Sequence, residues 1–224
     1  MKKRIVVIPA YEPDSRLINL VKKIDKDVDI VIVDDGSGND YKDIFKEAKL
    51  YGKVISYDLN HGKGYAMKEA FKYIREKYIE NYIVVCMDCD GQHSINDAMK
   101  LCDYVEDHPS TLVLGMRKRS ENVPLRSKLG NSITMGVYRF VTGVNVYDTQ
   151  TGLRAFSDNI MRFILSIDGD RYEYEMNMLL IAVRNSINIH ELEIQTIYID
   201  NNSGSHFNTF RDSYLIYKEI FKFS

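Results

Sequence analysis

The residues best suited to chemistry follow one short apolar run. Residues 82–87 end in the sequence Asp88-Cys89-Asp90-Gly91. Alternate side chains of an extended segment point the same way, so the carboxylates of Asp88 and Asp90 can meet one cation or one metal-bound phosphate. An isolated Asp-x-Asp after a strand is more often only a turn. The motif therefore predicts a ligand site only if neighbouring loops supply matching groups.

Composition limits the classes of protein to consider. The chain has 224 residues, of which 45% are hydrophobic, and this suffices for one large α/β domain. A formal net charge of −2 gives no electrostatic case for a nucleic-acid-binding protein. The three cysteines, Cys86, Cys89 and Cys102, form no disulfide framework, and we expect reduced thiols. No apolar run approaches bilayer length, so we expect a soluble chain that faces the cytosol.

Strands and helices alternate through the first half of the chain. The patterns predict strands over residues 4–8, 29–33, 53–59 and 82–87, and helices over residues 15–26, 41–51 and 64–78. Continuous apolar strands between amphipathic helices indicate an α/β fold with a mostly parallel central sheet and helices on both faces. Ligands of such sheets bind beyond the carboxyl ends of the strands, where residues 9–12, 34–35, 60–63 and 88–92 all lie.

These loops carry complementary groups. Tyr11 offers a flat face for a base, and Asp35 can accept a hydrogen bond from a ring N–H. Lys63, between two glycines at a helix start, offers charge and backbone N–H groups to a diphosphate. Asp88 and Asp90 can hold a divalent ion on that diphosphate, with the Gln92 amide oxygen as a third ligand. Each residue has a structural alternative by itself, but together they predict a nucleotide-diphosphate site.

Six segments in order resemble one known family. They are residues 7–12, 33–37, 60–64, 88–93, 114–117 and 148–156. They are similar to the signatures of family 2 glycosyltransferases with the GT-A fold, above all to the polyprenyl-phosphate sugar transferases of the dolichol-phosphate mannose synthase and bactoprenol glucosyltransferase type. The resemblance implies a Rossmann-like GT-A sheet and one catalytic domain over residues 1–224. In that domain residues 1–115 bind the nucleotide sugar and residues 116–224 bind the acceptor.

The resemblance also implies site residues. The nucleotide sugar is expected to contact Pro9, Ala10, Tyr11, Glu12, Asp35, Gly62, Lys63, Asp88 and Cys89. Asp90 and Gln92, together with Asp88, are expected to ligate Mg²⁺ or Mn²⁺. Arg117 and Arg126 are expected to grip the acceptor phosphate. Glu175 falls where many inverting members carry the carboxylate of their catalytic base.

Several segments of the second half leave alternatives open. A helix over residues 124–142 is either core-facing with a solvated basic face or an interfacial helix on anionic lipid. Arg154 is either a phosphate contact or a buried ion-pair partner. Residues 189–199 are expected to form one late edge strand, followed by a loop over residues 201–207 that resembles a donor-closing loop. An amphipathic tail over residues 210–223 leads, in similar proteins, into a GtrA-type membrane domain.

The expected activity is an inverting, metal-dependent transfer of a hexose from a UDP- or GDP-sugar to a polyprenyl phosphate at the cytoplasmic face of the membrane. A phosphate monoester is already largely dianionic near neutrality and needs no base, whereas a sugar hydroxyl does. Transfer to a hydroxyl of a cell-envelope polysaccharide, with Glu175 as general base, is the alternative enzyme. A non-catalytic nucleotide-sugar-binding module is the alternative from another class, and a homo-oligomer stays open.

Overall fold

The computed structural model describes residues 1–117, 125–195 and 207–223, and the side chains of residues 125–129 are outside this description. Seven strands form one sheet in the order β3-β2-β1-β4-β6-β5-β7. The strands are β1 (Lys3–Ala10), β2 (Asp29–Asp35), β3 (Lys53–Tyr57), β4 (Tyr82–Cys86), β5 (Thr111–Arg117), β6 (Arg154–Ser157) and β7 (Asn188–Ile194). Every pairing is parallel except the two made by β6, which confirms the mostly parallel sheet.

Helices cover both faces of this sheet, as predicted. They are α1 (Ser15–Val21), α2 (Lys42–Ala48), α3 (Lys63–Lys77), α4 (Ile95–Asp107), α5 (Leu125–Thr142), α6 (Asp158–Leu165), α7 (Glu173–Arg184) and α8 (Thr209–Phe223). Strand side chains alternate between two apolar cores. Val7 and Val84 face the core under α3, α6 and α7, whereas Val6 and Val85 face the core under α1, α2 and α4.

Strand β6 runs against its neighbours. Its first residue, Arg154, pairs in register with Cys86 at the end of β4 and with Leu114 near the end of β5. An antiparallel strand brings the loop that precedes it, rather than the loop that follows it, to the carboxyl ends of the parallel strands. Residues 143–153 therefore join the loops after β1, β2 and β4, and the end of β5, at one edge of the sheet.

The element boundaries differ from expectation in a few places. The helix predicted over residues 15–26 ends at Val21, and turns continue through Ile24. A 3-10 turn, η1 (Asn39–Tyr41), precedes α2. The late edge strand is confirmed as β7 up to Ile194, and residues 196–199 lie outside the described part. Residues 201–206 of the expected donor-closing loop also lie outside it.

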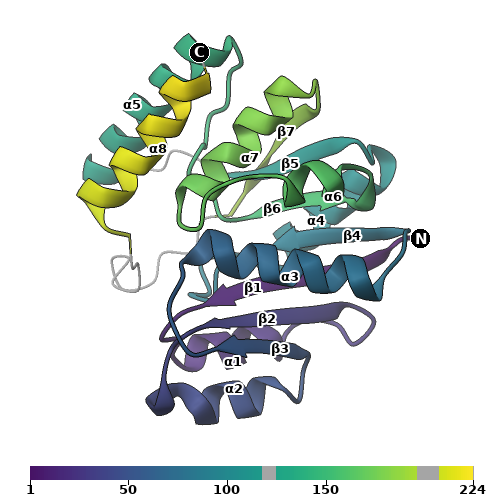
Figure 1. Ribbon diagram of the computed structural model, residues 1–224. Helices are drawn as coiled ribbons and strands as arrows, with labels where there is room; N and C mark the ends of the chain where they lie inside the picture. Colours follow the sequence, from purple (N-terminus) through teal and green to yellow (C-terminus); the bar gives the residue numbers. More distant parts are fainter. Residues whose placement is uncertain (118–124, 196–206, 224) are drawn as a thin grey trace.

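The two amphipathic segments of the second half lie together. Helix α8 packs on α7 and α5, and in Figure 1 α5 and α8 lie at the end of the molecule opposite β3. Both helices keep large apolar side chains exposed, among them Phe140 on α5 and Phe210 and Phe221 on α8. Among the helices in the described ranges, none combines the length and the apolar character that crossing a bilayer requires.

Candidate active site

Two glycines let Lys63 start α3 tightly against a distant part of the chain. A Cβ on Gly62 would lie 2.6 Å from the Asp170 carbonyl oxygen, and one on Gly64 would lie 2.5 Å from Cβ of Tyr174. Gly62 also has a φ of 112°, in a region that L side chains rarely adopt. The sequence Gly-Lys-Gly therefore serves close packing, and it delivers Lys63 to the beginning of α7.

Lys63 bridges two carboxylates. Its Nζ lies 2.7 Å from Oδ1 of Asp88 and 2.9 Å from Oε1 of Glu175. Burial by itself lowers the pKa of the ammonium, but the two carboxylates outweigh it and raise the pKa above its ordinary value. Glu175 is only 7% exposed. The structure thus brings together three predicted site residues from the segments after β3, after β4 and in α7.

Asp88, just beyond β4, contacts groups from several segments of the chain. Its Oδ2 lies 3.3 Å from Nε2 of His93, while Oδ1 meets Lys63. A Cβ on Gly152 would lie 2.2 Å from Oδ2 of Asp88, so the loop before β6 touches this carboxylate through a bare backbone. Although burial raises the pKa of Asp88, the charge of Lys63 and the contact with His93 bring the pKa well below its ordinary value.

Asp90 supplies further carboxylate oxygens near Asp88, and Gln92 follows it in the same loop. The carboxylate of Asp90 accepts the backbone N–H of Gln92 at 3.0 Å, and burial together with the nearby Asp88 raises the pKa of Asp90. Within the described ranges, no three His, Cys, Asp or Glu side chains gather into a metal-binding group. Mg²⁺ in nucleotide-dependent enzymes takes one or two carboxylates and completes its shell with phosphate oxygens and water. The donor set fits an ion of this kind.

Asp35 anchors the loop that leads to Lys63. Its carboxylate accepts from the Tyr57 hydroxyl at 2.8 Å, the Asn60 side-chain amide at 2.9 Å, and the backbone N–H groups of His61 and Gly62 at 2.9 Å each. A carboxylate has roughly four lone-pair positions. Recognition of a base N–H by Asp35, which stays a prediction, therefore requires one of these donors to yield its place.

The loop after β1 shapes the side of the site next to Asp35. Pro9 and Ala10 are the last residues of β1 and are buried, paired with Val33 and Asp34 of β2. Glu12 has a φ of 49°, and its N–H donates to the Ser37 hydroxyl at 2.9 Å. A hydrogen bond with Glu12 and partial burial raise the pKa of the Tyr11 phenol. The loops after β1 and β2 are thus tied to each other.

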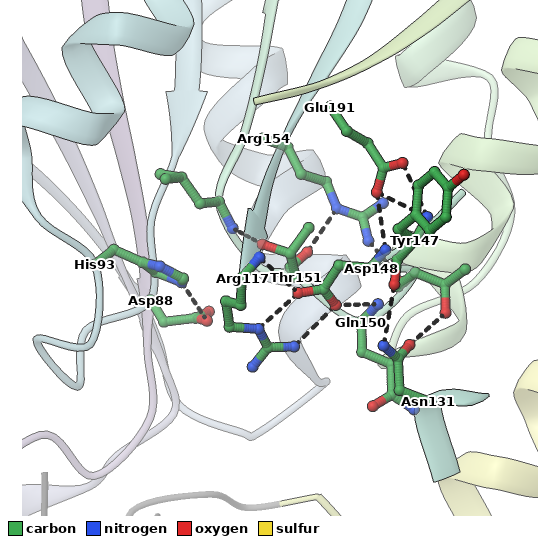
Figure 2. Close-up of polar contacts among 12 residues, drawn as sticks. Asp88, His93, Arg117, Asn131, Tyr147, Asp148, Gln150, Thr151, Arg154 and Glu191 are labelled. Atoms are coloured by element: carbon green, nitrogen blue, oxygen red, sulfur yellow. Dashed lines mark hydrogen bonds and ion pairs between the residues drawn. The ribbon is translucent and has the colours of Figure 1, made fainter. Parts of the chain in front are cut away.

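Arg117, at the end of β5, is paired with a residue of the loop before β6. Its Nε and Nη2 lie 2.7 and 2.9 Å from the two oxygens of Asp148, which is 3% exposed. Glu191 of β7 accepts the backbone N–H groups of Tyr147 and Asp148, at 2.9 and 2.8 Å. Figure 2 shows Asp148 between Arg117 and the Gln150 N–H. These contacts fix the direction in which the guanidinium points.

Arg154 braces the same loop from beneath. It has no exposed surface, and its guanidinium donates to the backbone carbonyls of Thr149, Thr151 and Glu175. Figure 2 shows Arg154 beside Thr151. Neither alternative from the sequence is found among its described contacts, which are to the backbone rather than to a ligand position or a carboxylate. Burial explains why Arg154 contacts the backbone, because every N–H of a buried guanidinium needs an acceptor and the nearby carbonyls provide them.

The other predicted residues have mixed outcomes. Cys89 lies between the two aspartates, and burial raises the pKa of its thiol to about 12, which makes it a poor nucleophile. Arg126 belongs to α5, but its side chain lies outside the described part. The sequence patterns indicate no role for Gly152, Tyr172 or Glu191. For Gly152 the residue type was a usable signal, since a glycine beside a charged motif often marks close backbone approach.

Comparison with known proteins decides the family. The sequence profile described as Glycosyl transferase family 2 matches residues 5–168, well over half of the chain. The chain belongs to this family. It is a glycosyltransferase, and the fold and the recognition from motifs are confirmed.

Two relatives resemble this glycosyltransferase over most of its length. The UDP-N-acetylglucosamine--dolichyl-phosphate N-acetylglucosaminyltransferase of Methanococcus voltae is 31% identical and covers 87% of this chain and 86% of the relative. The dolichyl-phosphate beta-glucosyltransferase of Saccharomyces cerevisiae is 27% identical, with 87% and 67% covered. Among solved structures, glucosyl-3-phosphoglycerate synthase from Mycobacterium tuberculosis with Mn²⁺, UDP and phosphoglyceric acid superposes with a TM-score of 0.66 at 17% identity, covering 99% of this chain and 77% of that one. The last likeness shows the GT-A fold alone.

Proposed function

We propose that this glycosyltransferase moves a hexose from a UDP- or GDP-sugar to a polyprenyl phosphate, with inversion at the anomeric carbon. The observation that carries the proposal is the Lys63 ammonium between Asp88 and Glu175. A cation fixed in a shielded site stabilises the negative charge that develops on a departing diphosphate. The acceptor class is supported by the two relatives, whose names specify dolichyl phosphate.

Different residues are proposed to bind the donor and the acceptor. Lys63 would donate to the diphosphate, and Tyr11 and Asp35 would line the base. Asp88, Asp90 and Gln92 would hold Mg²⁺ or Mn²⁺, and that ion would neutralise charge on the leaving diphosphate. The M. tuberculosis synthase, a protein of the same fold, was crystallised with Mn²⁺ and UDP. Arg117, and by resemblance Arg126, would bind the acceptor phosphate while one of its oxygens attacks the anomeric carbon from the opposite face.

The environment of Glu175 favours a phosphate acceptor over a hydroxyl acceptor. One oxygen of its carboxylate is already engaged by the Lys63 ammonium, at 2.9 Å. A phosphate acceptor needs no base, so Glu175 can be committed to holding Lys63 in place. Transfer to a polysaccharide hydroxyl, with Glu175 as base, is the second candidate, and it requires Glu175 to be released from Lys63.

The reaction would take place at a membrane surface, on the cytoplasmic face. Helix α8 exposes Phe210, Tyr214 and Phe221 and also carries Lys218 and Lys222. Aromatic and basic side chains on one amphipathic helix suit the boundary of an anionic bilayer. A GtrA-like membrane domain and a homo-oligomer stay predictions without further support.

Titration of the purified protein with UDP and GDP, each with Mn²⁺ and each with EDTA, tests the donor site. We expect one nucleotide to bind more tightly than the other, and both to require the ion. Transfer assays then compare polyprenyl phosphate with a water-soluble glycan, and we expect product only from the phosphate. Asp90→Ala should lose turnover but stay folded, because Asp90 lies in a partly exposed loop. Failure to bind either nucleotide would overturn the proposal, and transfer to the glycan would favour the hydroxyl acceptor.

A further inference from the structure

The first turn of α8 contains a carboxylate with no exposed surface. Asp212 accepts from Nε and Nη2 of Arg171 at 2.8 and 3.4 Å, and from the backbone N–H of Asn208 at 2.7 Å. The N-terminal end of a helix favours negative charge, but a buried carboxylate still needs a partner. The ion pair therefore fixes the side chain of Arg171 relative to α8.

Arg171 also touches the beginning of α3. A Cβ on Gly62 would lie 2.8 Å from Cγ of Arg171, and one on Gly64 would lie 2.8 Å from its carbonyl oxygen. The backbone N–H of Tyr65 donates to the Asp170 carbonyl at 2.9 Å. Because the glycines place no side chain between the two segments, a shift of residues 170–171 is transmitted directly to Lys63.

The next residue adds an aromatic link. The ring of Tyr172 lies 5.9 Å from Nζ of Lys63 and packs edge-on against Phe207, with ring centroids 5.0 Å apart. Phe207 precedes Asn208, whose side-chain oxygen accepts the N–H of Arg211 in the first turn of α8. An ionic contact and an aromatic contact thus join the start of α8 to residues 171–172, and both of these residues adjoin the Gly62-Lys63 turn.

We propose that Asp212 is a positioning residue for donor binding. Acting through Arg171, it holds the segment against which Lys63 is packed, and so keeps the ammonium where a donor diphosphate would meet it. The inference rests on the proposed role of Lys63 as the diphosphate contact. It assigns to α8, some 150 residues away in sequence, a share in the affinity for the donor.

The test measures donor affinity and acceptor kinetics separately. Asp212→Asn keeps the shape of the side chain but removes the charge that Arg171 requires. We expect a rise of roughly tenfold in the dissociation constant for UDP or GDP and in the donor KM, with the acceptor KM unchanged. Arg171→Lys, which keeps the charge but loses the planar fork, should give a smaller rise. Arg171→Gln combined with Asp212→Asn should be no worse than either change alone, because the pair acts as a unit.

Glu219→Gln is the matched control, since it removes an exposed ion pair with Lys222 on the same helix, and it should leave nucleotide binding unchanged. Circular dichroism and the melting temperature establish that each variant is folded, and Arg171→Lys carries the test if Asp212→Asn does not fold. Wild-type affinity in a folded variant would overturn the inference, as would equal rises in the two KM values. If the unaltered protein binds neither nucleotide, the proposed function fails as well.

Discussion

The ammonium of Lys63 lies 2.7 Å from Oδ1 of Asp88. Lys63 follows β3 and Asp88 follows β4, so this ion pair joins two of the loops that the sequence assigns to the donor. Burial opposes the charged form of both groups, and for each group the charge of the other is the largest factor that favours the charged form and shifts the pKa away from its ordinary value. Removal of either group should therefore be visible in stability as well as in activity.

Lys63→Met should destabilise the protein at neutral pH by about 3 kcal/mol, because it leaves two carboxylates without their shared cation. The pKa of Asp88 is lower in the folded protein than its ordinary 3.8, so the pair stabilises the fold above pH 3.8 and loses this effect as the pH falls further. The difference between wild type and variant should shrink accordingly between pH 4 and pH 2. Urea unfolding in EDTA measures it, and the exposed Lys22→Met serves as a control with little change.

Glu175→Gln separates the two roles considered for this residue. If Glu175 holds Lys63, the amide still accepts a hydrogen bond, and kcat with polyprenyl phosphate should fall by less than about tenfold. Loss of a general base would lower kcat by roughly 10²- to 10⁴-fold. Steady-state kinetics with saturating donor distinguish these outcomes, and a loss in the larger range would restore Glu175 as the base.

Gly152→Ala should damage turnover more than folding. The new Cβ would lie 2.2 Å from Oδ2 of Asp88, and the loop is braced by Arg154, so the carboxylate has to move. We expect kcat/KM to fall by roughly 10²-fold, as for a reacting group misplaced by about 1 Å. Gly136→Ala on α5 is the control, because its Cβ would meet nothing within 4 Å. Normal turnover in Gly152→Ala would show that Asp88 tolerates displacement.

Asp35→Asn should weaken the binding of UDP and the binding of GDP by similar factors. An amide accepts through one oxygen only, so at least one of the donors from Tyr57, Asn60, His61 and Gly62 loses its acceptor, and the loop before Lys63 loosens. Calorimetric titration of both nucleotides provides the readout. If only the affinity for the preferred nucleotide falls, Asp35 contacts the base directly.

The first half of the fold could be read from local patterns. Strands β1, β2 and β4 are largely continuous apolar runs, whereas β3 includes Lys53 and Ser56. Asp, Gly or Pro lies at or shortly after the end of each strand, so length and turn chemistry indicate the same element. Because parallel strands end at one edge, the prediction that Lys63 and Asp88 lie close together needed no knowledge of side-chain contacts. Their ion pair confirms this placement.

The structure of the second half was harder to predict, because it depends on pairings between distant residues that leave little signal in the local sequence. Strand β6 has only four residues, and it is a strand because β4 and β5 flank it. Glu191 and Asp212 look like ordinary charges of an edge strand and an amphipathic helix. Their partners, the backbone at Asp148 and the side chain of Arg171, lie 43 and 41 residues away in sequence. Only the structure shows that these two carboxylates have specific partners far away in the sequence.

The antiparallel course of β6 has a consequence for folding. Cys86 pairs with Arg154, which lies 68 residues later in the sequence. One edge of β4 therefore stays unpaired until most of the chain has been synthesised. Pairings of this sequence separation form slowly, because the loop must close before any contact compensates for the lost entropy. We therefore expect residues 1–115, made alone, to expose the edge of β4 and to aggregate. On this expectation, the loops assigned to the donor form a complete site only after β6 has paired with β4 and β5.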